Sequence, residues 1–85
     1  MTIALMWEAR APEGRGEELL AWARRQRTSR VPLRRETFRG PQDRVLVITW
    51  WDADLDAELP ELPEPDGELV TRAVHRWRFE AVDPD

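Results

Sequence analysis

The apolar residues of the chain fall into four strand-like segments and one helical segment. The run 44–51, with the sequence RVLVITWW, is the longest strand-like segment and is apolar at nearly every position. A strand with one solvated face alternates apolar and polar residues, so this run is predicted to be a central strand covered on both faces. Its side chains form two sets, Val45, Val47, Thr49 and Trp51 on one face and Leu46, Ile48 and Trp50 on the other.

A strand and a helix are expected before the hairpin that contains the central strand. Residues 2–10 alternate apolar side chains and are predicted to form the first strand. After a turn over residues 12–16, a helix is expected to run to about Arg27, because its apolar residues recur at a spacing of three to four. Trp22 is expected to lie between this helix and the sheet, whereas Trp50 is expected to pack under the helices.

The segments on either side of the central strand differ in composition. Residues 33–39 carry three arginines and few apolar side chains, which is typical of an edge strand, and the turn 40–43 joins them to the central strand as a hairpin. Residues 52–58 are predicted to form a short second helix, because Asp52 or Asp54 can cap it and Pro60 ends it.

The last strand is expected to begin at Glu68 or Leu69, after an extended loop, and to run to about Val82. One of its faces carries Ala73, His75, Trp77, Phe79 and Ala81. Residues 83–85 are expected to form a frayed tail.

The predicted order of elements is β-α-β-β-(α)-β, which is the ferredoxin-like pattern of an α+β protein. We expect a single domain over residues 1–85, with an antiparallel sheet and helices on one of its faces. The other face carries large apolar residues, and an exposed apolar sheet face implies a partner. Two copies stacked sheet to sheet would cover it and enclose a barrel, so a homodimer is predicted.

Two local features agree with a known group of proteins. They are the turn Pro12-Glu13-Gly14 before the first helix, and the strand 45–51 that leads through Asp52 into an acidic segment. With these features the chain, over about residues 3–82, resembles the dimeric α+β barrel superfamily, in particular its antibiotic-biosynthesis-monooxygenase-like group. Members typically end the third strand in a Trp, and Trp51 is similar to that residue. Known members include cofactor-free oxygenases that act on polycyclic aromatic substrates, and haem-degrading enzymes.

Departures from the pattern of this group bear on cofactors. Haem-degrading members place a ligand His on the second helix, and residues 52–58 contain none. The first-strand Asn that active members use is also absent, with Trp7 near its position, and the chain has no Tyr. The resemblance therefore implies chemistry without haem, and no cofactor is expected.

The candidate site is expected to lie inside the barrel. His75, the only histidine, is predicted to point inward beside Trp77 and is the candidate catalytic base, and Trp51 is the second candidate catalytic residue. Trp7, Trp77 and Arg72 are the candidate ligand-binding residues, because aromatic walls suit a planar ligand and an arginine suits an anionic group. The alternatives are a structural histidine, tryptophans that fill the barrel and the dimer interface, and a surface arginine.

Composition and charge argue against several other classes of protein. The chain has no Cys and one His, so neither a disulfide framework nor a metal site is expected. No apolar run is long enough to span a membrane and no signal-peptide pattern occurs, which predicts a cytoplasmic protein without a membrane partner. The net charge of −4 disfavours nucleic acid. Residues 24–39 are nevertheless rich in Arg, which is consistent with a solvated face or with pairing to the acidic loop of a second chain.

Two hypotheses from different classes follow. The first is a homodimer similar to cofactor-free monooxygenases of aromatic, polyketide-like small molecules, in which a deprotonated substrate reacts directly with oxygen. The second is a non-catalytic module of the same fold that binds a small ligand or a partner, which the missing Tyr and Asn favour. A third hypothesis, nucleic-acid binding through residues 24–39, runs against the net charge.

Overall fold

The computed structural model describes residues 1–83 and shows an α+β fold with a four-stranded antiparallel sheet. The elements in chain order are β1 (Thr2–Arg10), α1 (Gly16–Arg25), β2 (Arg34–Gly40), β3 (Arg44–Asp52), the short 3-10 helix η1 (Gly67–Leu69) and β4 (His75–Glu80). The strand order β2-β3-β1-β4 is compatible with the predicted ferredoxin-like arrangement. Residues 84 and 85 of the predicted frayed tail lie outside the described residues.

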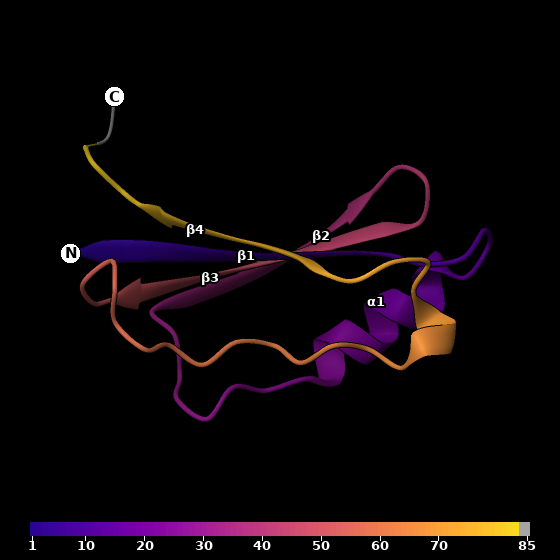
Figure 1. Ribbon diagram of the computed structural model, residues 1–85, viewed down its shortest axis with the longest axis horizontal. Coiled ribbons are helices and arrows are strands. Elements are labelled where there is room, and N and C mark those ends of the chain that lie inside the picture. Colours follow the sequence, from indigo (N-terminus) through magenta and orange to yellow (C-terminus); the bar gives the residue numbers. More distant parts are fainter. Residues whose placement is uncertain (84–85) are drawn as a thin grey trace.

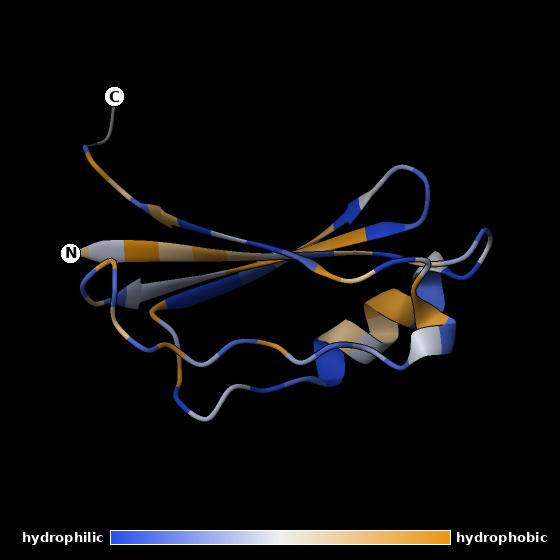
Figure 2. Cartoon of the chain, viewed as in Figure 1, coloured by the Kyte–Doolittle hydropathy of each residue, from blue (hydrophilic) through white to orange (hydrophobic). Residues whose placement is uncertain are grey.

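In the described part of the chain, one side of the sheet is covered and the other is not. Figure 1 shows α1 and the segment between β3 and β4 on the same side of the sheet. Figure 2 shows apolar residues concentrated in β1 and α1, whereas the turn between β2 and β3 is hydrophilic. The main core lies between these layers and is formed by Trp7, Ala9, Ala11, Leu19, Ala23, Val45, Val47, Leu62, Leu69 and Val74.

Helix α1 packs on the sheet through a narrow apolar strip. Leu19 and Ala23 on this strip are fully buried. Trp22 stacks against Trp7 with 6.0 Å between the ring centroids, so its predicted place between helix and sheet is confirmed. The guanidinium group of Arg35 on β2 donates hydrogen bonds to the carbonyl oxygens of Ala23 and Gln26 at the end of the helix, where Ala23 also accepts from the amide of Gln26.

The predicted second helix over residues 52–58 is wrong. This segment makes a single turn, in which the amide of Ala57 donates to the carbonyl oxygen of Asp54 at 3.1 Å. A helix this short before Pro60 cannot recover the cost of its first turn, because nucleation fixes three residues for one hydrogen bond. An extended segment replaces the helix. Leu62 in this segment and Leu69 in η1 are buried, and their side chains cover the sheet.

The last strand is shorter than the sequence pattern predicts. Residues 67–69 form η1 instead of the start of a strand, and β4 begins only at His75. Before that point the amide of Thr71 donates to the carbonyl oxygen of Arg10 at 2.9 Å, which anchors the approach to β4 outside the regular ladder. Alternating side chains therefore mark a strand here without marking its first residue.

Candidate functional site

The uncovered side of the sheet is a regular grid of side chains, which we call the open face. The strand register sets them in three rows across β2, β3, β1 and β4: Arg34, Trp50, Ala4 and Phe79; Glu36, Ile48, Met6 and Trp77; and Phe38, Leu46, Glu8 and His75. Eight of these twelve residues are apolar, and Phe38, Trp77 and Phe79 are 38%, 44% and 54% exposed. An exposed apolar patch of this kind marks an interaction surface.

Glu8 is the one acidic residue that β1 places on the open face. Its side chain is only 12% exposed, and its carboxylate accepts two hydrogen bonds from the Arg72 guanidinium, at 2.7 and 3.0 Å. Arg44 Nη1 lies 3.9 Å from the same carboxylate. These positive charges compensate a carboxylate that would otherwise be costly to hold away from water.

His75 faces Glu8 across the β1–β4 pair. Its Nδ1 lies 3.7 Å from Glu8 Oε1, and its ring meets the edge of Trp77 with 5.6 Å between centroids. The predicted neighbourhood of His75 and Trp77 is thus confirmed. At 3.7 Å, His75 Nδ1 and the Glu8 carboxylate are too far apart for a hydrogen bond. The His75 side chain is 50% exposed, so its ring nitrogens are open to a ligand.

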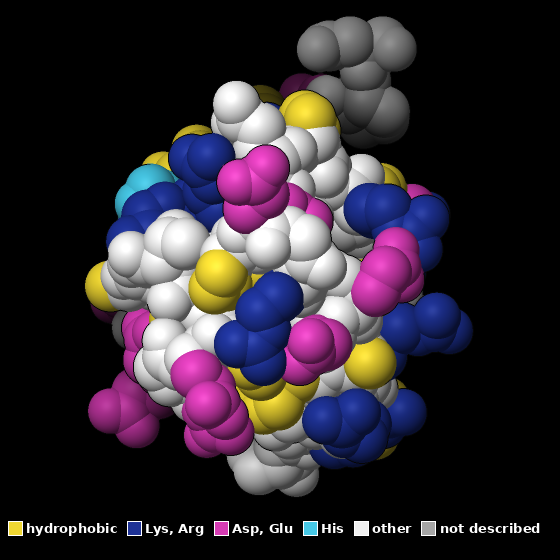
Figure 3. Space-filling view, turned by 90° about the vertical axis from the view of Figure 1, so that its right-hand side faces the viewer, with side chains coloured by type: hydrophobic (Ala, Val, Ile, Leu, Met, Phe, Trp, Pro, Cys, Tyr) yellow, Lys and Arg dark blue, Asp and Glu magenta, His cyan; other side chains and the backbone are white. Residues whose placement is uncertain are grey.

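Two hollows flank this cluster. One, of about 200 Å³, is lined by Glu8, Phe38, Arg39, Gly40, Arg44 and Leu46, and the other, of about 410 Å³, by Val74, His75, Arg76 and Trp77. Figure 3 shows the end of the molecule at which the histidine, in cyan, lies at the margin beside arginine side chains, while acidic and basic residues alternate over the rest of the surface. The cluster therefore combines apolar walls with a carboxylate, an imidazole and arginines.

The structure does not bring Trp7 and Trp51 to this site, so their predicted convergence with Trp77 is wrong. Both lie on the covered side of the sheet, 4% and 5% exposed. Trp7 Nε1 donates to the carbonyl oxygen of Pro63 at 3.2 Å, and Trp51 Nε1 donates to Thr49 Oγ1 at 2.9 Å. Because both rings are packed and both indole N–H groups are satisfied, these residues belong to the core.

The two faces of β3 are also the reverse of what the sequence suggested. Trp50, expected under the helices, lies on the open face, where Arg34 stacks over its ring with 5.0 Å to the centroid. Trp51, expected in the pocket, takes the covered side. The alternation along the strand is as predicted, but which face meets α1 is decided by the packing of the smaller residues Val45 and Val47 beneath the helix.

The residue that sequence reasoning missed is Glu8. A signal for it exists, since Glu8 continues the face of Ala4 and Met6 and is the only charged residue on either face of the strand before Arg10. A carboxylate in such a setting indicates a buried partner or a functional role. Arg72 was predicted as a ligand-binding residue, and the structure places it in the cluster, bound to Glu8.

Other features of the described residues delimit the site. Within residues 1–83, no group of three or more His, Asp or Glu side chains is arranged to hold a metal ion. None of the described helices has the length and apolar character needed to cross a membrane. No family model, curated protein or solved structure matches the chain.

Proposed function

We propose that the protein is a homodimeric ligand-binding module that pairs through its open faces and holds an aromatic small molecule beside His75. The apolar character of the open face supports pairing, because nothing in residues 1–83 covers it. A second copy is the occupant that fits best, since Arg34 and Glu36 on the edge strand pair with each other and leave no net charge there to repel a two-fold related copy. The proposed dimer is of the barrel type that the sequence pattern predicts.

The contact between His75 and Glu8 is the observation that carries the ligand site. A few convergent polar groups within aromatic and apolar walls are the usual composition of a small-molecule site. Trp77 supplies a flat surface at the edge of His75, and Arg72 holds the Glu8 carboxylate in place from the side. A planar ligand that bears an oxygen substituent would stack near Trp77 and form a hydrogen bond with the imidazole of His75.

Quenching of the protein's tryptophan fluorescence by the polycyclic probe anthrone tests this site. Saturable quenching is expected for the intact chain, and His75→Ala should weaken binding by about ten-fold, because a hydrogen bond to the ligand is lost. Leu55→Ala is the control, since this exposed residue lies outside the open face. Linear, unsaturable quenching, or equal loss in both variants, would contradict the proposal.

A second candidate is cofactor-free oxygenation at the same site, which the pairing of His75 with a carboxylate favours. His75 would take a proton from an electron-rich aromatic substrate, and the carbanion would transfer electrons to O₂ and bond to it at the same carbon. Loss of water from the resulting hydroperoxide converts a ring CH₂ into C=O, so one oxygen atom enters the product and the other leaves as water. Glu8 would stabilise the imidazolium that forms.

Oxygen uptake separates the two candidates. With anthrone, the oxygenase requires one O₂ consumed per quinone formed, and His75→Gln should lower the rate by roughly 100-fold or more while the quenching titration still detects binding. Binding without oxygen uptake above the rate in buffer would leave the ligand-binding module and reject catalysis.

A further inference from the structure

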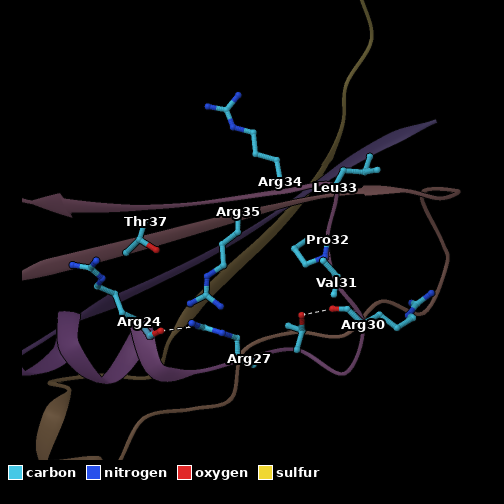
Figure 4. A pocket seen from close by; sticks show the side chains of 10 residues that line it. Arg24, Arg27, Arg30, Val31, Pro32, Leu33, Arg34, Arg35 and Thr37 are labelled. Carbon is cyan, nitrogen blue, oxygen red and sulfur yellow. Dashed lines mark hydrogen bonds between the residues drawn. The ribbon is translucent and has the colours of Figure 1, made fainter.

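A separate groove lies on the covered side of the sheet, at the C-terminal end of α1 (Figure 4). Its volume is about 630 Å³, and it is formed by the end of α1, the linker that follows and the start of β2. Five arginines, two threonines and three apolar residues line it, and no Asp or Glu does so. A volume of this size is within the range of ligand pockets, roughly 300–1,000 Å³.

Three of the arginines face the groove together. Figure 4 shows Arg27 and Arg35 reaching the same space, Arg27 from the linker just after α1 and Arg35 from β2, with Arg24 beside Thr37. Arg34 stands on the opposite side of β2, and Arg30 turns toward the Trp51 ring, 5.6 Å from its centroid. We call the surface formed by Arg24, Arg27, Arg35 and Thr37 the arginine groove.

The charge of the arginine groove is not neutralised within residues 1–83. None of its three arginines forms an ion pair with a carboxylate there. Arg27 and Arg35 bind carbonyl oxygens at the end of α1 instead. The helix end offers only about half a negative charge, whereas the three guanidinium groups carry three positive charges. A net positive site therefore remains on a chain whose overall charge is −4.

Helix capping leaves hydrogen-bond donors of these arginine side chains available. Each guanidinium has five N–H donors, and Arg27 and Arg35 each make two hydrogen bonds to the backbone. Burial, and then the nearby charge of Arg27, lower the pKa of Arg35. Arg24 makes no hydrogen bond from its side chain within the described residues, and capping gives no reason for its position.

We propose that the arginine groove binds a small soluble anion that carries two linked phosphate groups. Guanidinium groups match phosphate oxygens in a two-point geometry, and three of them suit a diphosphate better than a single carboxylate. Val31 and Leu33, 92% and 65% exposed at the rim, offer an apolar surface to the remainder of such a ligand. A nucleic-acid strand fits less well, because no aromatic residue lines the groove and the net charge opposes a long polyanion.

Calorimetric titration with inorganic pyrophosphate at constant ionic strength tests this proposal. We expect one site per chain and a loss of about ten-fold in affinity for Arg24→Gln, which removes one charge-assisted hydrogen bond. Arg25→Gln is the matched control, because it makes the same charge change on the same helix outside the groove. It should change the affinity by less than about two-fold.

Each other outcome counts against the proposal. No binding of pyrophosphate, or equal loss in Arg24→Gln and Arg25→Gln, would show that the groove is only a charged surface. Sedimentation with vesicles of phosphatidylcholine and phosphatidylglycerol distinguishes a lipid headgroup as the source of the phosphate. Vesicle binding that pyrophosphate does not displace would assign the groove to a membrane surface and overturn the soluble ligand.

Discussion

Asp43 fixes the loop before α1 through two backbone amides. Its carboxylate accepts hydrogen bonds from the amides of Gly14 and Gly16, at 3.1 and 3.2 Å. This contact brings the two segments so close that a Cβ on Gly16 would lie 2.7 Å from Asp43 Oδ1 and 3.1 Å from its Cα. Glycine at position 16 is therefore required by the space, and one carboxylate orders both the turn and the start of the helix.

Replacing Gly16 by Ala should destabilise the protein by about 1–3 kcal/mol, the usual cost of forcing a methyl group into filled space. Gly67→Ala is the control, since nothing lies within 4 Å of its added Cβ, and it should change stability by less than about 0.5 kcal/mol. Urea unfolding followed by circular dichroism measures both. Equal stability of the two variants would contradict the tight contact at Asp43.

The Arg15–Glu18 pair in the first turn of α1 gives a pH dependence of known sign. The hydrogen bond from Arg15, and then its charge, lower the pKa of Glu18 below its ordinary value of 4.5. A lowered folded-state pKa means that the pair contributes stability above about pH 4.5, and that this contribution is lost as the pH falls through the folded value. Glu18→Gln should be less stable than the natural chain near neutral pH, and the difference should shrink in acid.

Thermal unfolding at a series of pH values measures this difference. Glu13→Gln provides the comparison, because Glu13 forms no ion pair within the described residues. A gap between Glu18→Gln and the natural chain that stays constant down to acid pH would show that the carboxylate charge is not involved.

The extended segment between β3 and β4 covers the sheet in the place where a second helix was predicted. Leu62 and Leu69 are 4% and 9% exposed, and Trp7 Nε1 ties the segment to the sheet at the carbonyl of Pro63. An extended chain has fewer residues per ångström of its length than a helix, so fewer side chains cover the sheet and each buried leucine matters more. The prolines that prevent a helix here suit this extended path.

Leu62→Ala should lower the free energy of unfolding by about 2–4 kcal/mol, because the side chain leaves a cavity between the segment and the sheet. Leu55→Ala, at a residue that is 46% exposed, should cost less than about 1 kcal/mol. If both variants unfold at the same urea concentration, the segment is not part of the cooperative core.

Sequence reasoning predicted β1, β2, β3 and α1 well, but it failed between β3 and β4 and started β4 at Glu68 or Leu69 instead of His75. β1 was predicted over its observed residues, and α1 and β3 to within a few residues at their ends, because their periodicity is strong. The helix over residues 52–58 was wrong, because acidic residues and leucines at helical spacing describe a favourable helix surface without the length to nucleate one. Residues 67–69 carry no pattern that distinguishes η1 from the start of a strand.

The arrangement of side chains around the sheet was predictable only in part. Alternation in β3 gave two correct sets of side chains, and the open apolar face followed from it. The register of β4 against β1 pairs His75 with Glu8, and a register shifted by one residue would have put His75 on the covered side. No short-range pattern fixes that register, and so Glu8 was missed. No short-range pattern fixes which face of β1 and β3 meets α1 either, and so Trp7 and Trp51 were assigned to a site that they do not reach.

The open face gives the molecule an exposed apolar surface, and pairing through it is the basis of the proposed function. Its middle row places Ile48, Met6 and Trp77 side by side without any covering element in residues 1–83. Burying such a surface against an identical one removes apolar area from water on both copies, which is the main driving force of association. The ligand site beside His75 would then be closed by the second copy.

Sedimentation equilibrium in dilute solution tests this pairing directly. The account predicts twice the mass of one chain for the natural sequence, the mass of a single folded chain for Trp77→Glu, and twice the mass again for Leu55→Glu, which places the same charge on an exposed residue away from the open face. A natural chain that sediments as a folded monomer at tens of micromolar, or a Trp77→Glu variant that remains paired, would contradict it.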